Sequence, residues 1–167
     1  MKKRLSLIQM DVHVNEVEYN YVRVQELLSQ ALSEKPDIIV LPETWNTGFH
    51  PSKDLINISD RNGERTKALL STFAKEHNVN IVGGSVAVAK EDLVFNTSYA
   101  YNREGKLVGE YSKMHGFSPA KEDQYFASGT HTTHFELDGI PCSTVICYDI
   151  RFPELVRMAA LSNTELL

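Results

Sequence analysis

The N-terminal part of the chain places two apolar segments on either side of a helical pattern. Residues 4–12 read RLSLIQMDV and predict a strand. Residues 37–41 read DIIVL between two prolines and predict a short strand buried on both faces. Between these segments, apolar residues recur at steps of four and three, which predicts a helix with Val17, Tyr21, Val24, Leu28 and Ala31 on its inner face. Asn15, followed three residues later by Glu18, predicts the N-cap of this helix.

A second helical pattern begins at Glu64 and ends at His77. The residues expected on its inner face are Leu69, Leu70, Phe73 and His77. The run VNIVGGSVAVA, residues 79–89, then predicts a strand that two glycines weaken in its middle. Residues 94–102 and 106–113 predict two further strands, joined by a hairpin loop with the sequence Arg-Glu-Gly.

The C-terminal part continues with strands and closes on a helix. Residues 134–138 predict a strand, and residues 140–147, IPCSTVIC, predict a buried one. A last helix is expected to begin near Pro153, because proline is well tolerated in a first helical turn. The order of elements predicts a single α/β domain over residues 1–167, with a mixed sheet. A strand should return after the last helix, so we expect the chain to be an N-terminal fragment of a longer protein.

Composition narrows the class of protein. Hydrophobic residues make up 42% and charged residues 23% of the 167 residues, which is typical of a globular domain with a real core. The formal net charge of −5 gives no general attraction to nucleic acid or to an anionic membrane. The sequence predicts no signal peptide and no membrane span. Two cysteines cannot form a disulfide framework, so we expect a reducing, cytoplasmic location.

Three chemically capable residues each follow a predicted strand. Glu43 follows residues 37–41, and Lys113 and Cys147 end the strands that contain them. Ligands of open α/β sheets bind outside the carboxyl ends of the strands, so these side chains can converge on one crevice. A helix N-terminus and a nearby lysine would both lower the pKa of the Cys147 thiol.

Taken one at a time, these residues have ordinary explanations. Glu43 can be a cap or an ion-pair partner of Lys113, and a lysine at a strand end is usually solvated surface. A cysteine after an apolar run is usually a small core residue, a role that fits Cys142 better than Cys147. His131 and His134 lack further ligands at suitable spacing, apart from Asp149, so no metal site is predicted.

Read together, three segments resemble the nitrilase superfamily of carbon–nitrogen hydrolases. They are LPETWNTGF around Glu43, EYSKMHGF around Lys113 and ICYDIRFPEL around Cys147. That superfamily is recognised by a glutamate after a strand, a lysine followed by a histidine, and a cysteine followed by an aromatic residue, an aspartate and R-F-P-E. All three motifs are present in this order, and the resemblance covers the whole chain.

The resemblance implies a fold and a set of roles. The fold is an αββα sandwich, incomplete here at its C-terminus and dimerised in the complete protein. Cys147 matches the nucleophile, Glu43 the general base, Lys113 the catalytic lysine, and the Tyr148 backbone N–H an oxyanion donor. Glu122, in the loop after the lysine, matches an accessory glutamate. No metal or organic cofactor is implied.

The same resemblance points to the omega-amidase branch, whose members hydrolyse small monoamides such as 2-oxoglutaramate to carboxylic acid and ammonia. Three other interpretations stay open. The triad also fits a nitrilase or an N-carbamoyl hydrolase. The chain can be a binding module that kept the fold, or a truncation that is inactive in isolation because its second sheet is unfinished.

Overall fold

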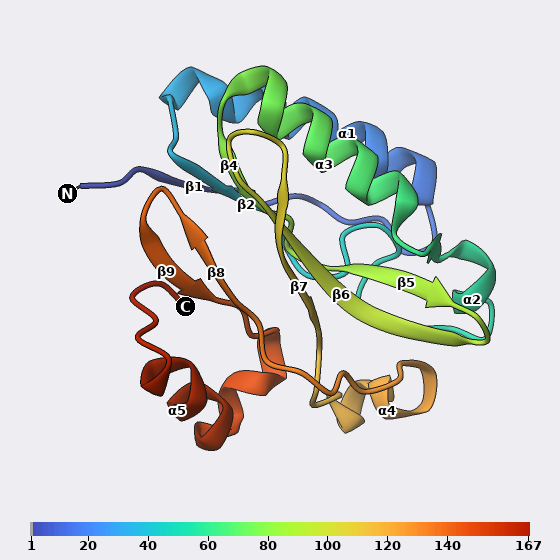
Figure 1. Ribbon diagram of the computed structural model, residues 1–167. Helices are drawn as coiled ribbons and strands as arrows, with labels where there is room; N and C mark the ends of the chain where they lie inside the picture. The colour runs from blue at the N-terminus through green and yellow to red at the C-terminus, as the bar shows by residue number, and fades with distance from the viewer. Residues whose placement is uncertain (1) are drawn as a thin grey trace.

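The computed structural model describes residues 2–167, which form a seven-stranded sheet, a separate hairpin and helices on both outer sides (Figure 1). The helices are α1 (Val17–Ala31), α2 (Leu55–Ile58), α3 (Glu64–His77), α4 (Glu122–Tyr125) and α5 (Pro153–Leu161). The strands are β1 (Leu5–Leu7), β2 (Ile38–Val40), β3 (Asp60–Arg61), β4 (Asn80–Val82), β5 (Val86–Lys90), β6 (Leu93–Tyr101), β7 (Leu107–Ser112), β8 (His134–Leu137) and β9 (Ile140–Ser143). Short 3-10 helices span Leu32–Glu34, Ser118–Ala120 and Cys147–Arg151.

The large sheet is mixed, as the order of elements predicts. Its strands follow the order β1-β2-β4-β6-β5-β3, and β7 pairs with β6 as well. The strands β1, β2 and β4 run parallel, whereas β6 is antiparallel to β4, β5 and β7. The long strand β6 therefore connects the parallel half of the sheet to the hairpin that ends just before Lys113.

The core is built on both faces of β2, as the sequence DIIVL predicts. Ile39 packs into the main core with apolar side chains of α1 and α3, and Ile38 packs on the opposite face with Leu137 and Cys142 of the β8–β9 hairpin. Figure 1 shows α1 and α3 side by side on one face of the sheet, the hairpin on the other face and α5 beyond it. This succession of layers is the αββα sandwich expected from the motifs.

The two long helices lie where the periodicity predicts, but two details were wrong. His77 is exposed rather than on the inner face of α3, with its ring centroid 4.3 Å from that of Phe73. Asn15 does not cap α1: Glu16 occupies the N-cap, without a side-chain capping bond. Asn15 instead adopts a left-handed conformation with φ of 63°, and its backbone N–H donates to the Thr47 carbonyl at 2.9 Å.

Three predicted strands are shorter than expected. The strand predicted over residues 4–12 is only β1, because its partner β2 has three residues and the pairing ends where Ile8 N–H meets the Val40 carbonyl at 2.9 Å. The strand predicted over residues 79–89 is divided into β4 and β5, because the glycine-containing segment between them bonds the loop after β2 instead.

The strand predicted over residues 140–147 ends at Ser143, so β9 stops before Cys147. The chain after α5 then returns to β9: Leu166 forms a parallel bridge with Cys142, and Ser143 N–H donates to the Leu166 carbonyl at 3.0 Å. The sequence pattern showed no strand returning after the last helix, but a returning segment does begin within the described residues. Across residues 2–167, no helix is long and apolar enough to cross a bilayer.

Candidate active site

Glu43 lies in the loop after β2, which is fastened to the loop after β4. Ser85 N–H donates to the Pro42 carbonyl at 3.0 Å, and Trp45 N–H donates to the Ser85 carbonyl at 3.1 Å. The Trp45 indole is fully buried in the main core and donates to the Gly83 carbonyl at 2.9 Å. Glu43 is therefore held between two anchored neighbours at the carboxyl ends of adjacent parallel strands, where ligands of such sheets bind.

Lys113 follows β7 directly and directs its ammonium group at two carboxylates. Its Nζ donates to Glu43 Oε1 at 2.8 Å and to Glu122 Oε2 at 2.7 Å. The side chains of Lys113 and Glu122 are only 3% and 1% exposed, so water screens this pair poorly. Burial alone would lower the pKa of Lys113, but the hydrogen bonds and charges of Glu122 and Glu43 outweigh burial and raise it. Lys113 is therefore a cation at neutral pH.

Glu122 opens α4, and its loop places it beside Lys113. Glu122 Oε2 also accepts a hydrogen bond from Phe117 N–H at 2.6 Å. The neighbouring acidic residue, Asp123, is exposed. Glu122 is thus the acidic residue of this loop that the structure brings into the site.

Cys147 opens the 3-10 helix Cys147–Arg151 in a left-handed conformation, with φ of 48°. This conformation is uncommon for residues other than glycine and turns an exposed thiol out of the chain between buried Ile146 and buried Asp149. Cys142, by contrast, is 3% exposed and packs in the core between the sheet and the hairpin. The two cysteines therefore occupy the contrasting environments that the sequence favoured.

The pKa of the Cys147 thiol is raised, which corrects the expectation that it would be lowered. Partial burial is the main cause, and the negative charge of Glu43 adds to it. Lys113 acts in the opposite direction, but burial and the negative charge of Glu43 outweigh it. The sequence argument failed because it counted the lysine without burial and without the carboxylate of Glu43. A thiol in this setting is protonated at neutral pH.

Tyr148 follows Cys147 in the same 3-10 helix. Its ring centroid lies 5.1 Å from that of Phe117 and 5.5 Å from that of Phe152. These aromatic contacts pack the Cys147 turn against the loop that follows Lys113. The backbone beside the thiol is therefore supported from two sides.

Asn96 is a site residue that sequence reasoning missed. It lies in the middle of β6, is 1% exposed, and its Nδ2 donates to Glu43 Oε1 at 3.0 Å. A small cavity of about 80 Å³ beside it is also lined by Lys113, Gly116 and Glu122. The available signal was an amide side chain within a predicted strand, because a buried amide needs a polar partner.

The histidines considered as metal ligands do not converge. His131 Nδ1 lies 2.8 Å from Thr130 Oγ1, and His134 Nδ1 lies 2.7 Å from Ser143 Oγ. Asp149 is buried elsewhere, beside Cys147. Among residues 2–167, no three His, Cys, Asp or Glu side chains are arranged to hold a metal ion.

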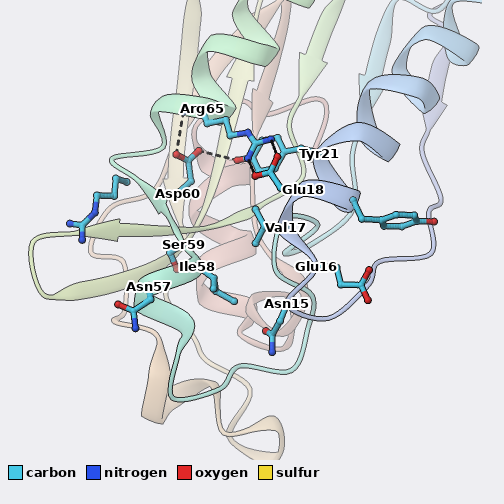
Figure 2. A pocket seen from close by; sticks show the side chains of 12 residues that line it. Asn15, Glu16, Val17, Glu18, Tyr21, Asn57, Ile58, Ser59, Asp60 and Arg65 are labelled. Atoms are coloured by element: carbon cyan, nitrogen blue, oxygen red, sulfur yellow. Dashed lines mark hydrogen bonds and ion pairs between the residues drawn. The ribbon is translucent and has the colours of Figure 1, made fainter.

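A groove lies away from this site, at the start of α1 and beside β3. Its volume is about 660 Å³, and none of the candidate catalytic residues lines it. Figure 2 shows that Glu18, Tyr21 and Arg65 of this groove are directed at one another: the Arg65 guanidinium lies 3.7 Å from the Tyr21 ring centroid and donates to Glu18 at 2.8 Å. These three side chains of the groove thus already have partners.

An αββα sandwich that gathers a glutamate, a lysine and a cysteine at the ends of its strands has the architecture and site composition of the nitrilase class. The chain matches the carbon–nitrogen hydrolase family over residues 4–167 and belongs to that family.

Two curated relatives and one solved structure place the chain within the family. It is 38% identical over its full length to 2-oxoglutaramate amidase of Bacillus subtilis strain 168, covering 64% of that protein. It is 29% identical over 98% of its length to the hydrolase in the agr operon of Staphylococcus aureus, covering 63% of that protein, a similarity that its motifs lead one to expect. The crystal structure of a CN-hydrolase superfamily protein from Xanthomonas campestris, with an arsenic adduct in its active site, superimposes with a TM-score of 0.81 at 30% identity. That match covers 91% of this chain and 56% of the other.

The chain therefore spans less than two thirds of the length of these relatives. The 38% identity of the chain to a 2-oxoglutaramate amidase agrees with the omega-amidase branch that the motifs indicate.

Proposed function

We propose that the protein hydrolyses a small amide to a carboxylic acid and ammonia, with Cys147 as nucleophile. The observation that supports this most strongly is the position of Glu43, which accepts a hydrogen bond from the Lys113 ammonium group at 2.8 Å and whose negative charge raises the pKa of the Cys147 thiol. A base, a cation and a nearby thiol are the groups that acyl transfer through a thioester requires. Residues 1–167 act in this proposal as one hydrolase domain.

The first half of the cycle forms a thioester. Glu43 takes the thiol proton while Cys147 Sγ attacks the amide carbonyl, which becomes a tetrahedral oxyanion. Lys113 and the Tyr148 N–H stabilise this oxyanion, a contribution of about 3 kcal/mol per donor in comparable sites. Glu43 then gives the proton to the leaving nitrogen, and ammonia departs.

The second half consumes water. Glu43 removes a proton from a water molecule, whose oxygen attacks the thioester carbonyl. The carboxylic acid leaves and the proton returns to Cys147 Sγ. Glu122 holds the Lys113 ammonium in place throughout, since its own carboxylate is fixed by Phe117 N–H at 2.6 Å. Every proton is carried by the chain's own groups or by water, so the cycle needs neither a metal nor an organic cofactor.

The substrate class that we favour is a small omega-monoamide of a dicarboxylic acid. The 38% identity to 2-oxoglutaramate amidase of Bacillus subtilis supports this choice. Nitriles and N-carbamoyl compounds are the alternatives that the same triad fits. A binding module with no turnover and a truncated chain with no activity are the alternatives outside catalysis.

We further infer that the whole protein is cytoplasmic and homodimeric, with a small-molecule amide as its partner and no role for nucleic acid or membrane. The two free cysteines agree with a reducing compartment. Exposed apolar side chains at the α5 side of the molecule, Ile150 at 62%, Met158 at 51% and Leu161 at 77%, favour self-association there.

Ammonia release from a panel of substrates tests the proposal. The protein, expressed from its complete reading frame, is given omega-monoamides, simple nitriles and N-carbamoyl amino acids. We expect the monoamides to give the highest kcat/KM. Faster release from nitriles or carbamoyl compounds would move the assignment to those classes, and no release by a folded protein would favour a binding role.

A further inference from the structure

Asp149 is a fully buried carboxylate two residues after Cys147, and it accepts four hydrogen bonds. Its Oδ1 accepts from the backbone N–H of His115 at 2.9 Å and lies 2.8 Å from His115 Nδ1. Its Oδ2 accepts from the Tyr111 hydroxyl at 2.6 Å and from Ile146 N–H at 3.1 Å. Because a carboxylate only accepts, the His115 imidazole carries a proton on Nδ1.

The four donors come from the two segments that carry the proposed chemistry. Tyr111 and His115 lie two residues before and two residues after Lys113, whereas Ile146 immediately precedes Cys147. One carboxylate thus ties the backbone on both sides of the lysine to the turn that carries the thiol.

A second contact joins the same two segments. The His115 ring stacks on the Phe152 ring, with centroids 3.6 Å apart and planes 11° from parallel. Phe152 in turn follows the 3-10 helix of Cys147, and its N–H donates to the Asp149 carbonyl at 3.0 Å. His115 is therefore fixed by a hydrogen bond at its edge and by stacking on its face.

The turn needs such support because Cys147 has a left-handed backbone conformation, with φ of 48°. A residue other than glycine held in this region costs on the order of 1–3 kcal/mol and persists only where its surroundings impose it. Relaxation of this strain would swing the thiol away from Glu43.

We propose that Asp149 is a positioning residue that, through Tyr111 and His115, holds the Cys147 thiol against Glu43 and Lys113. It does not itself touch the substrate. The kinetic part of this inference rests on the proposed function, in which Cys147 is the nucleophile.

The test uses Asp149→Asn in the protein expressed from its complete reading frame, with Asp92→Asn in the exposed β5–β6 turn as matched control. An asparagine has one acceptor oxygen where the carboxylate has two, so at least one of the four bonds is lost. We expect kcat to fall about 100-fold, the size typical of a group misplaced by 1 Å, with KM changed less than about threefold. The control keeps the wild-type kcat.

A graded pair at His115 separates positioning from general destabilisation. His115→Asn keeps a side-chain N–H donor near the position of Nδ1, whereas His115→Leu removes it. We expect the asparagine variant to keep most of the turnover and the leucine variant to lose most of it. Equal losses in these two variants would overturn the proposal, and so would a wild-type kcat in Asp149→Asn. If Asp149→Asn does not fold, the pair at His115 decides alone.

Alkylation of Cys147 by iodoacetamide keeps the test independent of the substrate. Burial and the negative charge of Glu43 raise the pKa of Cys147, and both depend on the position of the turn. Displacement of the turn should therefore move the pH midpoint of alkylation in Asp149→Asn down toward about 8.5, the value of a free cysteine. A shifted midpoint in a protein that releases no ammonia would retain the positioning role and retire the proposed function. An unchanged midpoint in a protein that releases ammonia would retain the proposed function and overturn the positioning role.

Discussion

Lys113 Nζ lies 2.8 Å from Glu43 Oε1, although the two residues are 70 positions apart in the chain. Glu122 binds the same ammonium group at 2.7 Å, so two carboxylates surround one buried cation. Burial is the main reason why the Cys147 thiol is harder to ionise than a free cysteine, and the negative charge of Glu43 adds to it despite the lysine nearby. In the mechanism that we propose, the thiol proton is therefore transferred to Glu43 during attack.

Removing one of the two carboxylates should make the thiol easier to ionise. In Glu122→Gln, the negative charge of Glu122 no longer opposes the thiolate, and Lys113 is less neutralised. We expect the pH midpoint of Cys147 alkylation to fall, because one negative charge that opposes the thiolate is removed. The measurement is the rate of iodoacetamide labelling between pH 6 and 10. Glu104→Gln, in the exposed β6–β7 turn, should leave the midpoint unchanged. A midpoint that rises in Glu122→Gln would contradict this electrostatic account.

Gly84 should be essential to the loop that carries Glu43. It has φ of 57°, and a Cβ added there would collide with the backbone carbonyl oxygens of Leu41 and Pro42. Gly84→Ala should therefore reduce the free energy of unfolding by more than about 2 kcal/mol, because backbone atoms cannot move aside cheaply.

Gly139→Ala is the matched control for this loop. Gly139 also has a positive φ, of 81°, but a Cβ there meets nothing within 4 Å. Only the cost of the left-handed conformation remains, about 1 kcal/mol. Urea unfolding of both variants makes the comparison, and equal losses would show that the close approach of Gly84 to the preceding loop is unimportant.

Arg103 should contribute to stability in a pH-dependent way. Its guanidinium donates to Asp138 in the β8–β9 turn at 2.7 Å and to Asp37 before β2 at 2.8 Å. The Arg103 hydrogen bond is the main cause that depresses the pKa of Asp138 below its ordinary value. A carboxyl with a depressed pKa stabilises the fold above its unfolded pKa, about 3.9, and that contribution is lost as the pH falls toward the folded pKa.

Arg103→Met tests this cluster. The partners are partly exposed, so the expected loss at pH 7 is only about 1 kcal/mol. The wild-type protein and the variant should become more similar in stability as the pH falls below about 4. Thermal unfolding at about pH 7, 5 and 3 gives the comparison, because the contribution of the ionised carboxyl is complete at neutral pH and is lost between roughly pH 5 and pH 1. A difference in stability between the two proteins that grows on acidification would contradict this prediction.

The sequence predicted correctly those features that depend on residues close together in the chain. Apolar spacing located α3 from Glu64 to His77 and the inner face of α1 at Tyr21, Val24 and Leu28. The short motifs around Glu43, Lys113 and Cys147 pointed to residues that the fold brings together. Helical periodicity and strand-end chemistry are properties of neighbouring residues, so one sequence suffices to read them.

The features that sequence reasoning missed depend on distant partners. The segment after β4 leaves the sheet because Ser85 bonds Pro42 and Trp45, which no local pattern reveals. The direction of the Cys147 pKa shift depended on burial and on Glu43, and the role of Asp149 depended on Tyr111 and His115. These relationships become visible only when the chain is folded.

Cys142 provides an internal control for the assignment of the nucleophile. It is buried between the sheet and the β8–β9 hairpin, where its pKa is raised by burial and its sulfur fills core space. Cys142→Ala should cost about 1 kcal/mol of stability and leave the turnover of folded molecules unchanged. A severe loss of kcat in a folded Cys142→Ala protein would mean that the wrong thiol has been chosen.

The most direct test of the central claim is ammonia release from a small omega-monoamide by the protein expressed from its complete reading frame, compared with its Cys147→Ala variant. The account predicts release by the wild-type protein and by Cys142→Ala, and none above background by a folded Cys147→Ala protein. Turnover by Cys147→Ala at a rate close to that of the wild type would contradict a thioester on Cys147, and the mechanism would have to be abandoned.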